Sequence, residues 1–199
     1  MPWIEPVTLE GSTVRLIPAE LAHAEALHAA CPSDTFAYFV TLQPQDSSLD
    51  AFRDYLSKRI QALNMVTFAV QNIETERFIG ETAFMDIRPE ARGLEIGLTW
   101  YAEDCRGTKV NPECKLLLLT HAFEECNALR VTLKTDARNL HSQAAIRKLG
   151  AHYEGTLRRH GIQPNGFIRD TAYFGITDLD WPEVKARIQS RLQSLKNAK

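Results

Sequence analysis

The stretch between residues 94 and 135 constrains the fold of this chain more than any other. Two segments with β-strand character, near 94–101 and 129–135, flank a segment that predicts a helix from about 112 to 126. Asn111-Pro112-Glu113 indicates the helix start, with Asn111 as N-cap, proline at the first helical position and an acid in the first turn. Because a strand–helix–strand crossover joins parallel neighbours, we expect these two strands to run parallel in one sheet.

The rest of the chain predicts antiparallel strands and covering helices. Short turns join the period-two segments between residues 66 and 101, which is typical of an antiparallel meander. The remaining expected elements are strands near 13–17, 152–160 and 168–177, helices near 19–31, 49–63 and 139–149, and a C-terminal helix over about 180–196, after an irregular lead-in over 1–12. This order predicts an α/β (α+β) fold, with a mixed, mostly antiparallel central sheet of about seven strands flanked by helices. We expect a single domain over 1–199, with its core at about 13–177.

The segment near 94–101 shows a regular alternation of apolar and polar residues. We expect one face of this strand to carry Leu94, Ile96, Leu98 and Trp100, and the other to carry Glu95, Thr99 and Tyr101. Glu95 is therefore a carboxylate on the polar face of an otherwise apolar strand.

Composition and charge exclude several classes of protein. The 199 residues include 23 Lys and Arg against 25 Asp and Glu, a formal net charge of −2, which argues against a nucleic-acid partner bound by phosphate neutralisation. The longest aliphatic run, Leu116–Leu119, is far shorter than a membrane span, and the first residues lack the pattern of a secretion signal. The four cysteines form no CxxC pair and no histidines have HxxxH spacing. We therefore expect free thiols, no metal site and a cytoplasmic location.

The turn Asp104–Asn111, between the predicted strand and the predicted helix, is a candidate anion site. Free backbone N–H groups, the positive end of the helix dipole, and the side chains of Arg106 and Lys109 converge there, which suits a phosphate or pyrophosphate. The alternative is a capped turn with two solvated basic side chains. The GxxxxGK[ST] pattern of a Walker loop is absent from the sequence.

Three further motifs accompany this turn and carry a family resemblance. They are Glu95-Ile96-Gly97-Leu98, the Asn139-x-x-Ser142 opening of a helix, and Glu154-Gly155-Thr156-Leu157-Arg158. Over about Val14 to Ile176 the chain resembles the GNAT family, and within it the RimJ/RimL-like branch, whose founding members acetylate protein N-termini. The resemblance implies the GNAT acyl-CoA N-acyltransferase fold and acetyl-CoA as co-substrate.

The resemblance also implies a set of cofactor-binding residues. The family pattern at the phosphate turn is Q/R-x-x-G-x-G/A. Arg106 fits its first position, whereas Lys109 and Asn111 replace small residues, so the backbone of Lys109 has to avoid a positive φ. The pyrophosphate is then expected at Arg106, Gly107, Thr108, Lys109, Val110 and Asn111. The main chain of Trp100 and Tyr101 is expected to pair with the amides of the pantetheine arm.

Proton transfer is expected to involve residues on the same strand and on the helix after Asn139. Many GNAT enzymes protonate the leaving thiolate with a Tyr seven residues after this Asn, where the chain has Ile146. Ser142, three residues after it, is the RimL-like alternative, although its hydroxyl could instead only satisfy a first-turn backbone group. Asn139 is the N-cap, and the resemblance adds a contact to the pantetheine arm. Glu95 is the expected base, unless it is an exposed or salt-bridged carboxylate; His160 and a water molecule are alternatives.

The implied function is that of an acetyl-CoA-dependent N-acetyltransferase. It would move an acetyl group to a primary amine, on a protein N-terminus or a small molecule, by direct attack in a ternary complex. The alternatives are an acyltransferase with another acyl-CoA donor, and a CoA-binding sensor or interaction module without turnover. The resemblance also implies a homodimer, and we expect no metal, nucleic-acid or membrane partner.

Overall fold

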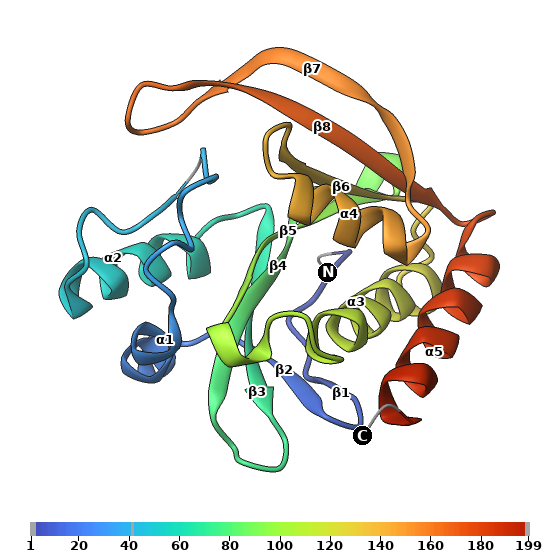
Figure 1. Ribbon diagram of the computed structural model, residues 1–199, viewed down its shortest axis with the longest axis horizontal. Helices are drawn as coiled ribbons and strands as arrows, with labels where there is room; N and C mark the ends of the chain where they lie inside the picture. The colour runs from blue at the N-terminus through green and yellow to red at the C-terminus, as the bar shows by residue number, and fades with distance from the viewer. Residues whose placement is uncertain (1–2, 41, 198–199) are drawn as a thin grey trace.

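One eight-stranded sheet runs through the whole molecule (Figure 1). The computed structural model describes residues 3–40 and 42–197. The strands are β1 (Leu9–Glu10), β2 (Val14–Pro18), β3 (Met65–Asn72), β4 (Phe78–Arg88), β5 (Gly93–Tyr101), β6 (Arg130–Asp136), β7 (His152–Ile162) and β8 (Ile168–Thr177). They lie in the order β1-β2-β3-β4-β5-β6-β8-β7, and all neighbouring pairs are antiparallel except β5 and β6.

Helices cover both faces of this sheet (Figure 1). They are α1 (Ala24–Ala30), α2 (Leu49–Ile60), α3 (Val110–Thr120), α4 (Leu140–Leu149) and α5 (Trp181–Asn197). The pair α1 and α2 packs on one face through a cluster that includes Leu27 and Phe52. The other three helices pack on the opposite face through a larger cluster that includes Leu118, Ile146 and Ile188. The mixed, mostly antiparallel architecture predicted from the sequence is confirmed.

The predicted crossover is also confirmed, because residues 93–95 of β5 pair in parallel with residues 130–132 of β6. The number of strands is larger by one than the expected number of about seven. The lead-in over 1–12, predicted to be irregular, contains β1, whose Leu9 and Glu10 pair with Leu16 and Arg15. A two-residue strand is too short to show a period-two pattern, so only its pairing with β2 reveals it.

The start of α3 differs from the prediction. The helix begins at Val110, and Lys109 rather than Asn111 occupies the N-cap position. Gly107, with a φ of 75°, turns the chain early enough for Lys109 to adopt a helical φ of −70°. Lys109 thus avoids a positive φ, as the phosphate turn requires. Asn111 lies inside the first turn, where its side-chain oxygen accepts a hydrogen bond from the Tyr101 hydroxyl at 3.3 Å.

A β-bulge in β5 changes the predicted faces of this strand. The register between β4 and β5 shifts at this point, and Leu98 has a φ of 49°. Ile96 packs in the cluster of α3, α4 and α5, whereas Trp100 packs in the cluster of α1 and α2. The prediction that Leu94, Ile96, Leu98 and Trp100 share one face is therefore wrong, because one extra residue reverses the alternation.

A buried polar network between α2 and the sheet holds the side chain of Trp100 in the core. Its Nε1 donates to Glu81 Oε2 at 2.7 Å, and the same oxygen accepts hydrogen bonds from the Tyr55 hydroxyl and Arg59 Nη1, each at 2.8 Å. The side chains of Glu81 and Arg59 are both fully buried. The attraction between the two opposite charges offsets part of the cost of burying each of them.

Candidate active site

The start of α3 presents free main-chain N–H groups at the surface. The amides of Gly107, Thr108 and Lys109 have no acceptor among the residues that the structure describes. The Thr108 hydroxyl supports the turn, since it donates to the Cys105 carbonyl at 2.7 Å and accepts from the Val110 amide at 3.3 Å. Together with the helix dipole, these amides form a positive site that suits phosphate groups.

Arg106, the predicted phosphate ligand, is engaged elsewhere in this structure. Its Nη1 and Nη2 donate to the carboxylate oxygens of Asp34, in the loop between α1 and α2, at 3.0 and 2.7 Å. These hydrogen bonds lower the pKa of Asp34 and raise the pKa of Arg106. Arg106 can therefore approach a phosphate only by sharing or exchanging its contact with Asp34.

The strands β5 and β6 separate beyond their short parallel ladder. The ladder ends at Glu95 and Thr132, and β6 continues only alongside β8. From Ile96 to Tyr101, β5 therefore has main-chain groups without a strand partner on its β6 side. Because the two strands are parallel, the helices that follow them, α3 and α4, begin at the same edge of the sheet (Figure 1). Ligands of mixed α/β sheets bind in such a crevice.

The start of α4 matches the prediction from the sequence. Asn139 is the N-cap, and its Oδ1 accepts the Ser142 N–H at 3.0 Å. Gly150 ends the helix with a φ of 106°. The Ser142 hydroxyl makes no hydrogen bond with any residue that the structure describes, so it does not serve the backbone of the first turn. It is half-buried and available to a ligand.

Glu95 is a buried carboxylate that is paired with Lys134. It is only 5% exposed, and the Lys134 Nζ lies 2.6 Å from its Oε2. Burial raises the pKa of Glu95, although the neighbouring ammonium opposes this shift. Burial lowers the pKa of Lys134, but the ion pair with Glu95 outweighs this effect and keeps the pKa above its ordinary value. Gly97 leaves room for the other oxygen, since a Cβ there would lie 3.2 Å from Glu95 Oε1.

Lys134, the partner of Glu95, was not predicted from the sequence. In the parallel register Thr132 lies opposite Glu95, and Lys134, two residues further along β6, shares the face of Thr132. The alternation of side chains along the predicted strand 129–135 places Thr132 and Lys134 on one face, and this pattern was the available signal. Only the register, which depends on the pairing of β5 with β6, identifies the partner.

His160, the alternative base, lies exposed on β7. Its ring nitrogens contact the hydroxyls of Tyr173 at 3.1 Å and Thr171 at 3.2 Å. The ring of Tyr173 in turn lies 5.0 Å from the Lys134 Nζ. Both candidate bases therefore belong to one face of the sheet, with Glu95 at its centre and His160 near its outer edge.

Two buried side chains of the β7–β8 hairpin join it to the loop between α1 and α2. Gln163 Nε2 donates to the Ala37 carbonyl at 3.1 Å, and Arg169 Nη1 donates to the Tyr38 carbonyl at 2.8 Å. Figure 1 shows the hairpin arching over this part of the molecule. These hydrogen bonds join residues that are 126 and 131 positions apart in the chain, although neither segment carries a functional pattern in the sequence.

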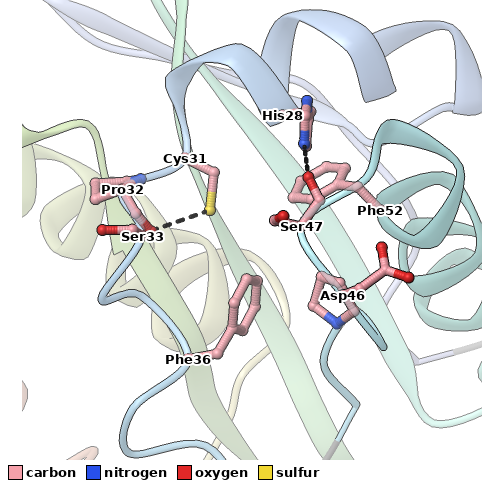
Figure 2. A pocket seen from close by; sticks show the side chains of 9 residues that line it. His28, Cys31, Pro32, Ser33, Phe36, Asp46, Ser47 and Phe52 are labelled. Atoms are coloured by element: carbon pink, nitrogen blue, oxygen red, sulfur yellow. Dashed lines mark hydrogen bonds between the residues drawn. The ribbon is translucent and has the colours of Figure 1, made fainter.

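A cavity of about 230 Å³ lies between α1, α2 and the loop that joins them (Figure 2). Its lining residues are His28, Cys31, Pro32, Ser33, Phe36, Pro44, Asp46, Ser47 and Phe52. His28 Nε2 contacts the Ser47 carbonyl oxygen at 2.9 Å, which ties the loop to α1. Burial raises the pKa of Cys31 to about 11, so its thiol is protonated at neutral pH and is a poor nucleophile.

The four cysteines are free thiols, as predicted. Over residues 3–40 and 42–197, no group of three His, Cys, Asp or Glu side chains is arranged to hold a metal ion. In the same part of the chain, no helix is both long enough and apolar enough to cross a membrane.

A mixed sheet whose one parallel pair opens beside two helix starts places this chain among the α/β proteins, whose ligands commonly bind in such an opening. The model of one family within this class, the Acetyltransferase (GNAT) domain, matches residues 13–152. The chain belongs to this family, and the family resemblance inferred from its motifs is confirmed.

Individual relatives agree with this assignment. The Bacillus subtilis (strain 168) protein named "Putative ribosomal N-acetyltransferase YdaF" is 31% identical over 90 residues, which are 45% of this chain and 48% of that protein. The alignment with this curated relative therefore spans about half of its length.

Solved structures cover almost the whole chain. A "putative acetyltransferase" from T. thermophilus is 34% identical, with a TM-score of 0.89 over 96% of this chain and 100% of that one. A GCN5-related N-acetyltransferase from Brucella melitensis is 27% identical, with a TM-score of 0.89 over 96% and 87%. Mycobacterium smegmatis RimJ in complex with CoA-disulfide is 19% identical, with a TM-score of 0.79 over 94% and 95%, which shows the fold alone.

Proposed function

We propose that this protein transfers an acetyl group from acetyl-CoA to a primary amine, without a metal ion. The observation that carries the proposal is the unpaired edge of β5, which leads from the phosphate turn into the opening between β5 and β6. Membership of the GNAT family supports the same function.

The residues around this opening fit acetyl-CoA. The free amides of Gly107, Thr108 and Lys109 suit the pyrophosphate, and the first turn of α3, with Val110 and Asn111, adds the helix dipole. The main-chain N–H and C=O groups at the end of β5, at Trp100 and Tyr101, have no β6 partner. They suit the amides of a pantetheine arm, which would pair with them in place of a neighbouring strand. Asn139 borders the opening at the start of α4, and Arg106 is a further phosphate ligand once it leaves Asp34.

Glu95 has the properties of the general base. When bound, acetyl-CoA supplies a thioester carbonyl that a neutral amine attacks while the bond to sulfur breaks. An amine is mostly protonated at neutral pH, so a group must accept its proton. Glu95 Oε1 lies beside Gly97 while Oε2 is held by Lys134, and burial makes this carboxylate more basic than an exposed one. It accepts the proton directly or through a water molecule; His160 is the second candidate.

Ser142 is the candidate general acid. Its hydroxyl has no hydrogen-bond partner among the described residues, and Asn139 accepts its backbone N–H. The hydroxyl stands in the first turn of α4, where the helix dipole favours negative charge. There it donates its proton to the departing thiolate, and the helix start stabilises the same charge.

A protein N-terminus is the first acceptor class to test, and a small-molecule amine is the second. The name of the Bacillus subtilis relative points to ribosomal proteins as acceptors. The junction of the β7–β8 hairpin with the loop near Ala37, held together by the buried side chains of Gln163 and Arg169, is where we expect such a peptide to lie.

The decisive experiment measures thiol release from acetyl-CoA with a panel of N-terminal peptides and small amines, alongside calorimetry with acetyl-CoA. We expect binding and amine-dependent thiol release, with the acetylated nitrogen identified by mass spectrometry. Turnover only with another acyl-CoA would identify a different donor, and binding without any turnover would identify a sensor. No binding at millimolar acetyl-CoA would refute the proposal. Light scattering on the same sample tests the predicted homodimer against the chain mass of 22.5 kDa.

A further inference from the structure

Lys115 is a buried cation that has no carboxylate partner within residues 3–40 and 42–197. It lies in the middle of α3 and is 5% exposed. Its ammonium donates hydrogen bonds to the Thr99 hydroxyl at 2.7 Å and to the Thr82 hydroxyl at 3.4 Å. Among the ion pairs of the described residues, none includes Lys115.

The two threonines lie where the ladder between β4 and β5 is interrupted. The Cα register skips Thr82, so this residue has no cross-strand partner at the bulge. The Thr82 and Thr99 hydroxyls are 2.8 Å apart, and the Thr99 hydroxyl also contacts the Gly97 carbonyl at 3.3 Å. Lys115, Thr82 and Thr99 thus form a side-chain hydrogen-bond network across the gap in the ladder.

A charge at this position lowers stability on its own. Burial of an ammonium without a counter-charge is unfavourable, and it lowers the pKa of Lys115 to about 8, an effect that the neighbouring Cys114 opposes. A methionine would fill a similar volume without this penalty. A methionine could not donate hydrogen bonds to Thr82 and Thr99, so the network across the bulge depends on the lysine ammonium.

The bulge also belongs to the candidate site, because it lies on the part of β5 whose β6-facing edge is unpaired. We propose that Lys115 is a positioning residue, which acts through Thr99 to hold the bulge of β5 in the shape that lets its main chain bind the pantetheine arm of acetyl-CoA. The inference rests on the proposed function, since it assumes that this edge binds the arm. Lys115 itself lies beneath the strand and is not assigned to any step of the reaction.

Two ligands separate this role from a general effect on the fold. In the proposed binding mode coenzyme A contacts both the phosphate turn and the edge of β5, whereas 3′,5′-ADP keeps the 3′-phosphate and one 5′-phosphate but lacks the pantetheine arm. In calorimetry we expect Lys115→Met to weaken coenzyme A binding by about tenfold and to leave 3′,5′-ADP binding within about twofold of the wild type. Lys58→Met, at an exposed position on α2, is the matched control and is expected to change neither affinity.

Thr99→Val tests the same network without removing the cation, and Thr99→Ser retains the hydroxyl. We expect Thr99→Val to reproduce the selective loss of coenzyme A affinity and Thr99→Ser to preserve wild-type binding, so the test stands even if Lys115→Met does not fold. Unchanged coenzyme A affinity in folded Lys115→Met or in Thr99→Val, or an equal loss for both ligands, would overturn the inference. Failure of the wild-type protein to bind coenzyme A would instead refute the proposed function.

Discussion

The side-chain oxygen of Asn139 accepts the backbone N–H of Ser142 at 3.0 Å, while the Ser142 hydroxyl makes no hydrogen bond with the part of the chain that the structure describes. One residue therefore serves the backbone of the first turn of α4, and the other is available to a ligand. The two roles predict different consequences of substitution.

Ser142→Ala is expected to lower kcat by about 10²-fold, at the low end of the range for a lost general acid, because water can replace the hydroxyl in part. Acetyl-CoA affinity and the melting temperature should stay close to those of the wild type, since the hydroxyl makes no hydrogen bond with the described residues of the folded protein.

Asn139→Ala should instead lower stability by about 1 kcal/mol through loss of the cap. Steady-state kinetics, calorimetry and thermal unfolding on one preparation check both variants, with Ser190→Ala on α5 as the control. A wild-type kcat in Ser142→Ala would remove this residue from the mechanism.

The ion pair between Lys134 and Glu95 predicts a pH effect on activity. The base must be ionised, so activity should fall at low pH as Glu95 takes up a proton. Burial raises the pKa of Glu95, and the Lys134 ammonium limits this rise. In Lys134→Met the acidic limb of the kcat/KM profile should therefore move to higher pH.

Glu95→Gln is the companion variant, and it should lose most activity at every pH. Lys148→Met, at an exposed position on α4, should keep the wild-type profile. A limb that stays in place in Lys134→Met would argue that Glu95 is not the titrating base and would favour His160 or water.

The ion pair between Arg106 and Asp34 competes with the use of Arg106 for phosphate. Asp34→Asn should free the guanidinium and tighten coenzyme A binding by about two- to fivefold, which matches the modest strength of an exposed ion pair. Arg106→Glu should weaken binding because it places a negative charge beside the phosphates. Calorimetry at two salt concentrations tests both, since the gain in Asp34→Asn should shrink at high salt. Weaker binding in Asp34→Asn would indicate that the loop contact itself supports the site.

Lys115 predicts a pH dependence of stability. Its pKa is lowered by burial to about 8, against an ordinary value of 10.5, so between these pH values the unfolded chain binds more protons than the folded one. Stability contributed by this group therefore rises with pH across that window, by at most about 3 kcal/mol. The unfolding free energy of the wild type, measured relative to Lys115→Met, should increase from pH 7.5 to 10.5. The subtraction removes the titration of Tyr101, which both proteins share, whereas Cys114 is coupled to Lys115 and contributes to the measured difference. A difference that is flat with pH would contradict the assignment.

Much of the fold follows from patterns within a few residues of each other. The crossover that pairs β5 with β6, the Asn139 cap and the Gly150 end of α4 were all predicted correctly, because each depends on local hydrogen bonds or on a short period of apolar residues. The turn that precedes α3 was located for the same reason, although the helix begins at Val110 rather than after Asn111. That error arose because the left-handed conformation of Gly107 and the Lys109 N-cap, which makes no side-chain hydrogen bond, have no recognisable sequence pattern.

The sequence by itself therefore determined the family, the order of the elements and the identity of Glu95 and Ser142 as candidates. Only the tertiary structure decided what these groups contact. The partner of Arg106 lies 72 residues away, and Lys115 meets Thr82 across 33 residues. The bulge at Leu98 likewise depends on the pairing of two strands rather than on the strand that contains it. Contacts of this kind form only when the packed sheet brings distant segments together and excludes water from their charges, and no local propensity encodes that result.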